Sequence, residues 1–284
     1  MGFLIPPSGG IIIYAVLTEQ SIGRLFMAGI IPGIILTLLF IGAIYLVVRR
    51  NPDSGPQGEK SSRQDRMSAL WHSVPIVAVV LITIGGMYTG FFTPVEASSV
   101  GAFLTLVVAL LRRSLSLEKM RSVILETMSA TSTVFLIIIG AFVFIPFMSL
   151  TELPGQLVSF LTSLPIGTVG VLLVIIVTYL FLGMFLEGIA MLVLTIPVVI
   201  PIAIGLQWDL IWFGIIMVIV LEMGMISPPV GINVFVVKSI APDVPMGTIF
   251  RGIWPFWFAM AAMIVLLILF PQLALFLPET IVGG

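Results

Sequence analysis

The chain has 284 residues, of which 60% are hydrophobic and 9% charged, with a formal net charge of −1. Its mean hydropathy of +1.26 exceeds what a soluble domain of this size needs, so the composition predicts an integral membrane protein. The net charge says little about partners, but the sequence has no basic patch for nucleic acid, which excludes that class. The lack of cysteine with only one histidine argues against a transition-metal site.

The first predicted element is a broken helix. Residues 3–17 are apolar, but Pro6-Pro7 removes two backbone donors and must open the helix there. Residues 25–48 are long enough to cross a bilayer core of about 30 Å. A polar loop is predicted at 49–73, and further spans are predicted at 74–91, 95–111 and 122–148.

Lysine and arginine set the predicted orientation. They gather in the loop 49–73 and again at 112–121, which places both loops on the cytoplasmic side. Following the spans from there, the turn 18–24 lies outside and the loop 241–250 lies inside. A mixed segment, 151–165, is expected at the outer interface.

The last third contains a second broken helix. Residues 166–206 form two apolar arms around Glu187-Gly188, which could be two full spans or one re-entrant hairpin. Residues 210–240 run inward through Pro228-Pro229, and residues 252–277 cross outward again.

The two proline breaks belong to a repeat. Gly-x-x-x-Pro-Pro occurs at Gly2–Pro7 and at Gly224–Pro229, and Gly-Ile-x-Pro follows at Gly29–Pro32 and at Gly252–Pro255. The loops after the two breaks fall on opposite sides, which predicts an inverted repeat. Because the second copy has a long section upstream of its break, the chain is expected to begin partway through the first repeat of a longer polypeptide.

Such breaks suit the binding of a cation and an anion. Unwound backbone frees carbonyl oxygens that can hold a small hard cation such as sodium, and the half-helix after the break directs its positive end at an anion. Ser227 adds a hydroxyl and Asn233 an amide. The alternative is that each Pro-Pro pair only kinks a span.

Three glutamates lie in or against apolar segments, where a carboxylate costs about 2.5–3.5 kcal/mol at the bilayer centre. Glu187 and Glu222 are candidates for an ion-linked or proton-linked role, with helix capping or loop orientation as the alternative. Glu96 follows Thr93-Pro94 and is expected to close a capping box. Four tryptophans are interpreted as interfacial anchors: Trp208, Trp212, Trp254 and Trp257.

Three motifs together resemble a known family. Ile5–Ser8, Phe92–Ala97 and Ser227–Asn233 resemble the large membrane subunit of tripartite ATP-independent periplasmic (TRAP) transporters, in an N-terminally truncated form. The resemblance implies an all-α membrane protein, an inverted-repeat elevator-type secondary transporter with broken helices and a re-entrant hairpin. It also implies a multi-pass protein of the bacterial inner membrane.

The resemblance implies sodium-coupled uptake of an organic acid, either a dicarboxylate or a sugar acid. The implied partners are membrane lipid, a small four-helix membrane subunit and a periplasmic substrate-binding protein. Sodium would be held mainly by backbone, and the residues implied are Gly2, Ile5, Pro6, Gly183, Gly224, Ser227 and Pro228. The implied substrate-binding residues are Ser8, Gly188 and Asn233.

The implied domain division alternates along the chain. Residues 1–24 and 166–251 would form the transport domain, residues 25–165 the scaffold-type spans, and residues 252–284 a final span with an outer tail. Two alternatives stay open: an ion-coupled anion carrier that needs no binding protein, and a non-functional remnant. An intramembrane enzyme is not expected, since the spans contain no HExxH motif, paired aspartates or Ser/His dyad.

Overall fold

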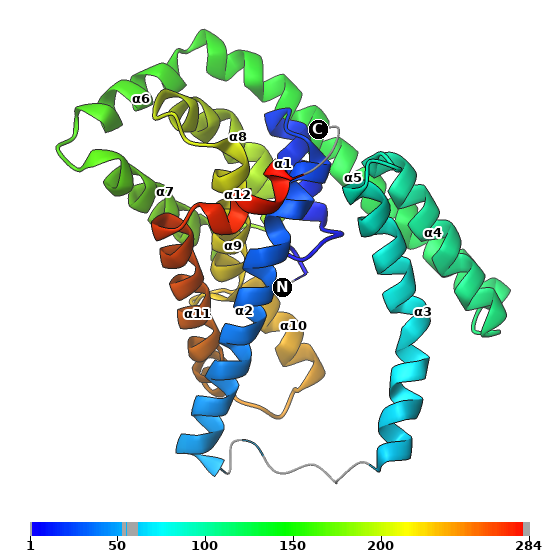
Figure 1. The fold of residues 1–284 in the computed structure, drawn as a ribbon. Coiled ribbons are helices and arrows are strands. Elements are labelled where there is room, and N and C mark those ends of the chain that lie inside the picture. Colours follow the sequence, from blue (N-terminus) through cyan, green and yellow to red (C-terminus); the bar gives the residue numbers. More distant parts are fainter. Residues whose placement is uncertain (1, 53–54, 56–61, 281–284) are drawn as a thin grey trace. The chain divides into compact units, whose positions relative to one another are not determined.

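The computed structural model describes residues 2–52, 55 and 62–280. Within these residues the chain folds into helices only (Figure 1). They are α1 (Gly9–Thr18), α2 (Ile22–Arg50), α3 (Arg63–Tyr88), α4 (Pro94–Leu111), α5 (Leu117–Leu150), α6 (Leu153–Ser163), α7 (Gly167–Gly183), α8 (Gly188–Gly205), α9 (Leu210–Ile226), α10 (Ile232–Ile240), α11 (Met246–Leu269) and α12 (Gln272–Glu279).

Most predicted elements are confirmed, but the polar loop 49–73 is wrong over its second half. Helix α3 begins at Arg63, because Ser62 caps it and Asp65 returns the bond in a capping box. Part of the predicted loop, at 53–54 and 56–61, lies outside the described residues.

The single span predicted at 252–277 is also wrong, because α11 ends at Leu269 and a separate helix, α12, begins at Gln272 after Pro271. Among the described residues, six helices are long and apolar enough to cross a membrane: α2, α3, α4, α5 up to Phe144, α8 and α11.

The chain forms two compact units. Unit 1 contains residues 1–47 and 136–279, and unit 2 contains residues 48–135 and 280–284. In unit 2, α3 and α4 pack together as a helical hairpin, and α4 begins with the predicted Thr93–Glu96 capping box and Pro94 in its first turn. The division into transport and scaffold domains stays a prediction.

Helix α9 is the centre of unit 1. Every residue from Ile211 to Met225 is buried, which an apolar helix with no polar face requires. Helices α1, α7, α8 and α11 pack around it. The broken segments therefore lie against the most enclosed helix of this unit rather than on its outside.

The contacts of α1 show that the two half-helices leave the breaks in opposite directions. Phe3, in the first broken segment, bonds to Glu222 near the end of α9, whereas the Tyr14 hydroxyl donates to the carbonyl of Leu210 at its start. Helix α1 thus runs back along α9, while α10 continues beyond the end of α9 (Figure 1).

Helices α2 and α11, which carry the Gly-Ile-x-Pro copies, are also antiparallel. Ile31, early in α2, shares a groove with Leu266, late in α11. Further along α2, the ring of Phe40 lies 5.2 Å from that of Phe256, which is earlier in α11. The predicted inverted relation of the two copies is therefore confirmed for the helices that follow each break.

Candidate functional site

The first broken segment, residues 2–8, is closed by Ser8. The Ser8 side chain is only 1% exposed; it caps α1 by accepting from the backbone N–H of Ile11 at 3.3 Å and donates to the carbonyl of Phe3. The Pro6-Pro7 peptide bond is cis. Because proline has no N–H to offer to carbonyls of the preceding turn, the Ser8 hydroxyl supplies a donor in its place.

Two glycines of α2 let this segment approach closely. A Cβ on Gly29 would lie 2.5 Å from the carbonyl oxygen of Leu4, and one on Gly33 would lie 2.9 Å from Cγ1 of Ile5. Gly29 is the first residue of the Gly-Ile-x-Pro motif. That motif therefore has a packing role, since its glycine makes room for the unwound backbone of the same repeat.

The second broken segment comprises residues 224–231, the end of α9 and the turn after it, and contains Ser227, which is 3% exposed. Its hydroxyl donates to the carbonyl of Met223 at 2.6 Å and accepts from Nε1 of Trp257 at 3.0 Å. The indole N–H of Trp257 is therefore directed at the break, and the interpretation of this residue as an interfacial anchor stays a prediction. Pro228-Pro229 is cis, and Gly231 follows with a φ of 60° that favours glycine.

The two apolar arms predicted at 166–206 are α7 and α8, joined by a short turn. Glu187 caps α8 by accepting from the N–H of Ala190 at 3.0 Å, so its capping role is confirmed and its ion-linked role stays a prediction. The turn meets the second break, since the N–H of Gly231 donates to the carbonyl of Met184 at 3.3 Å. These contacts place the turn between α7 and α8 against the second break, and the choice between a re-entrant hairpin and two full spans stays open.

Backbone touches backbone where the hairpin meets α9. A Cβ on Gly183 would lie 2.9 Å from Cα of Gly224, and one on Gly224 would lie 2.8 Å from Cα of Gly183. No side chain larger than hydrogen fits at either position without separating α7 from α9. The structure thus brings together two predicted residues that are far apart in sequence, at the start of the segment that contains Ser227.

The two broken segments and the hairpin turn converge at Gly188. A Cβ there would lie 3.3 Å from Sδ of Met225 and 3.7 Å from Cε1 of Phe3. Phe3 and Met225 are equivalent residues of the two Gly-x-x-x-Pro-Pro copies. The sequence analysis did not single out either one, although aligning the copies pairs them directly.

A second link joins the copies through Glu222. Its Oε1 accepts from the backbone N–H of Phe3 at 3.1 Å, across 219 positions of sequence. The other predicted residues differ in access: Pro6 is buried and Pro228 half-buried, whereas Gly2, Ile5 and Asn233 are exposed. Their ion-binding and substrate-binding roles stay predictions.

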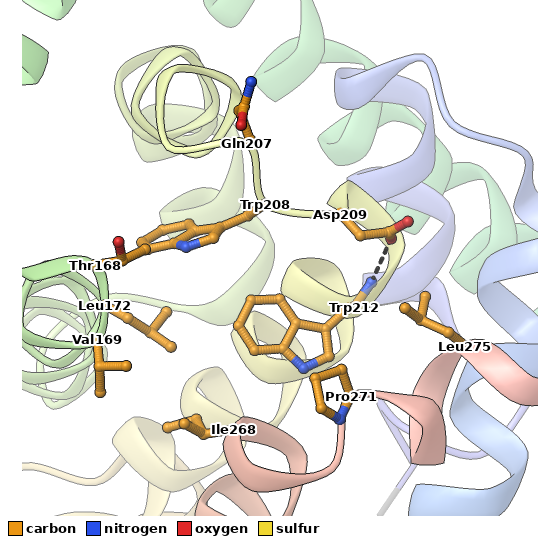
Figure 2. A pocket seen from close by; sticks show the side chains of 10 residues that line it. All are labelled: Thr168, Val169, Leu172, Gln207, Trp208, Asp209, Trp212, Ile268, Pro271 and Leu275. Carbon is orange, nitrogen blue, oxygen red and sulfur yellow. Dashed lines mark hydrogen bonds between the residues drawn. The ribbon is translucent and has the colours of Figure 1, made fainter.

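A separate cavity of about 250 Å³ lies at the other end of α9 (Figure 2). Trp208 and Trp212 form part of its wall, but the carboxylate of Asp209 is directed at the backbone of α9 and accepts from the N–H groups of Ile211 and Trp212. The cavity lies at the opposite end of α9 from the breaks, and its one acidic side chain caps α9. It is therefore separate from the site that the breaks form.

Apolar spans, paired broken segments and a hairpin turn that meets them define an all-α membrane transport protein. The sequence comparisons agree with this class. The family of the tripartite ATP-independent periplasmic transporter, DctM component, matches residues 1–273. The chain belongs to this family of transporter permeases and is a multi-pass protein of the bacterial inner membrane.

Curated relatives carry several substrate names. The chain is 34% identical over 282 residues to a C4-dicarboxylate TRAP transporter large permease protein of Pseudomonas aeruginosa, covering 98% of the chain and 65% of that protein. It is 32% identical over 285 residues to a sialic acid permease of Vibrio cholerae, covering 100% and 66%. An ectoine/5-hydroxyectoine permease of Ruegeria pomeroyi is 33% identical over 282 residues, covering 98% and 65%. The chain thus spans about two thirds of the length of these relatives.

Proposed function

We propose that the chain is the membrane-permease subunit of a sodium-coupled importer of organic acids. The observation that carries this proposal is the convergence of the two broken segments and the hairpin turn on Gly188, next to Phe3 and Met225. In transporters built from inverted repeats, broken helices meet in this way near the bilayer midplane, where they hold ions and substrate.

The donors beside the breaks suit a hard cation. They are backbone carbonyls of the two proline-interrupted segments and the hydroxyl of Ser227, whereas cysteine is absent from the chain. Oxygen donors of this kind favour small hard cations over soft metals. One sodium ion would be held by the backbone around Gly2, Ile5 and Pro6, and a second by Gly183, Gly224, Ser227 and Pro228.

The helix ends suit an anionic substrate. Helices α1 and α10 both begin directly after a break and lead away from it in opposite directions. The N-terminal end of a helix carries partial positive charge, so both ends favour a carboxylate between them. Ser8, Gly188 and Asn233 lie at the starts of α1, α8 and α10 and are the candidate substrate contacts.

The transport cycle and partners complete the proposal. The hairpin and broken helices would move as an elevator against a scaffold, with substrate delivered by a periplasmic binding protein and with a small four-helix membrane subunit bound to the permease. The relatives' names support acids such as C4-dicarboxylates and sialic acid, and also ectoine. Such a protein transports its substrate unchanged and is not an enzyme.

Reconstitution tests the proposal. The chain, produced with its small membrane subunit, is placed in proteoliposomes, and uptake of labelled succinate, sialic acid and ectoine is measured with and without the binding protein. We expect uptake only with the binding protein and an inward sodium gradient. Uptake without the binding protein would instead identify an independent carrier, uptake that ignores sodium would refute the coupling, and no uptake of any compound would favour a remnant.

A serine pair sharpens the sodium assignment. Ser227→Ala removes the hydroxyl at the second break, and we expect the sodium concentration for half-maximal uptake to rise about tenfold. Ser239→Ala is the matched control, because its hydroxyl is exposed and bonds only to the carbonyl of Val236 in α10. An equal rise in both variants would contradict a specific sodium contact.

A further inference from the structure

Glu222 is the acidic residue that the fold encloses. Of the acidic side chains in the described residues, it alone is buried, with 9% of its surface exposed. It lies on the last turns of α9, two residues before Gly224 and five before Ser227. A buried carboxylate is retained only where hydrogen bonds offset its lost hydration.

One of those bonds comes from the opposite repeat. The N–H of Phe3 donates to Oε1 of Glu222 at 3.1 Å. The position of this donor is fixed from its other sides as well, because the Phe3 carbonyl accepts from Ser8 and a Cβ on Gly10 would lie 2.3 Å from the Phe3 ring. The carboxylate and the first broken segment therefore stabilise each other in this one arrangement.

Both ends of this bond lie close to the proposed ion sites. Phe3 precedes Ile5 and Pro6 by two and three residues, and Glu222 is on the same helix end as Gly224. A shift of the last turn of α9 changes the position of the carboxylate and with it the peptide of Phe3. The hydrogen bond is thus a direct mechanical connection between two segments that otherwise belong to different repeats.

We propose that Glu222 is a positioning residue that couples the two broken segments, so that an ion held at one segment favours binding at the other. The coupling of ions rests on the proposed function, whereas the anchoring of the first segment by Glu222 does not. The backbone N–H of Phe3 needs an acceptor oxygen. The side-chain amide of glutamine at position 222 provides one, whereas an apolar side chain of similar size does not.

The absence of native cysteine permits a direct measurement of the anchoring. Gly9→Cys is the reporter, because Gly9 is exposed directly after the first break and a Cβ there meets nothing within 4 Å. In sodium-free buffer we expect Glu222→Met to raise the maleimide labelling rate at this cysteine at least about fivefold, and Glu222→Gln to leave it unchanged. Val16→Cys, at the far end of α1, should label at one rate in all backgrounds.

Sodium dependence of uptake then measures the coupling. In the reconstituted complex we expect a Hill coefficient above 1 for the parent and for Glu222→Gln, falling to 1 for Glu222→Met. Glu126→Gln and Glu126→Met, in the exposed part of α5, are the matched controls and should match the parent. Methionine fills the space of the glutamate with an apolar side chain of similar size, so Glu222→Met is expected to fold.

Each result is decisive. If Glu222→Met leaves both labelling and cooperativity unchanged, the proposal is overturned. If Glu222→Gln is as damaging as Glu222→Met, the charge and not the acceptor matters, and the positioning role is overturned. If labelling responds as expected but parent uptake ignores sodium, the anchoring stands and the proposed function fails.

Discussion

The two broken segments share a motif but are held in different ways. The second is enclosed by its own repeat, because Gly224 touches Gly183 of the hairpin and the N–H of Gly231 bonds to Met184 in its turn. The first segment lies against α2 of its own repeat and takes its polar anchor from Glu222 of the other. The two segments therefore share a sequence motif but differ in the elements and contacts that hold them.

This difference teaches where each segment is vulnerable. Around the second segment, the contacts of Gly224 with Gly183 are between backbones and leave no room for adjustment, and the Ser227 side chain adds a bond to Trp257. The first segment is held partly through side chains, as at Glu222, and partly through close approach of its backbone to α2. Two of its residues, Gly2 and Ile5, are exposed. Substitutions should therefore damage the second segment through packing and the first through loss of individual anchors.

Gly224→Val should have the largest effect, because its side chain would have to occupy the space of the Gly183 backbone. Overpacking of this kind costs roughly 1–3 kcal/mol and occasionally more, so we expect the melting temperature of the detergent-extracted protein to fall by about 10 °C. Gly247→Val is the control, since a Cβ at Gly247 meets nothing within 4 Å. Equal melting temperatures for the two variants would contradict the backbone contact.

Gly29→Ala tests the corresponding approach at the first segment. The Cβ of the alanine would lie 2.5 Å from the carbonyl oxygen of Leu4. We therefore expect the free energy of unfolding, measured by thermal unfolding, to fall by about 2 kcal/mol. Gly33→Ala should cost less, because it meets the flexible side chain of Ile5 instead. Gly42→Ala, with open space around it, should be neutral or gain up to about 1 kcal/mol from the helix preference of alanine. A reversed order would show that the first segment does not rest on Gly29.

Ser8→Ala removes the cap of α1 together with the bond to Phe3. We expect a loss of about 1 kcal/mol in unfolding free energy and faster labelling of a cysteine at Gly9. Ser21→Ala is the comparison, because Ser21 accepts from the N–H of Arg24 in an exposed setting and should cost less. Unchanged labelling after Ser8→Ala would mean that the Ser8 cap does not order the segment.

Tyr14→Phe should have the smallest effect. It removes the bond to the carbonyl of Leu210 that holds the far end of α1 to α9, which contributes roughly 0.5 kcal/mol to the unfolding free energy. The exposed Tyr45 gives the control, Tyr45→Phe, which should leave the melting temperature unchanged. Since Gly9 is close to the break and Tyr14 is not, labelling at Gly9→Cys should not respond; if it does, α1 transmits motion along its length.

Local chemistry made much of the fold predictable from sequence. Proline lacks a backbone N–H, so it interrupts a helix at the two breaks whatever packs around them. Thr93-Pro94 with Glu96 caps its helix through bonds within four residues. The start of α3 was missed because a charged first turn resembles a loop, although Ser62 with Asp65 carries the same capping signal.

The candidate site was predictable only in part. The sequence shows that Glu222 places a carboxylate in an apolar segment, which costs free energy. Its partner Phe3 is 219 positions away and contributes a backbone N–H that every residue except proline has. The bond between Trp257 and Ser227 was not predicted for a similar reason, since an indole near the end of an apolar segment suits an interface as well as this bond. Contacts that depend on how helices meet carry no local signature.

The glycine contact between α7 and α9 limits how the permease can change shape. With main chains in direct contact, rotamer changes cannot open a passage between these helices, so the hairpin cannot act as a flap hinged at its turn. In the elevator motion proposed above, the hairpin, α9 and the second break would instead be displaced as one rigid body. The loop that contains Gln207, which adopts a φ of 56°, joins α8 to α9 and belongs to this rigid body, so any bending would lie in the connections that lead into α7 and out of the second break.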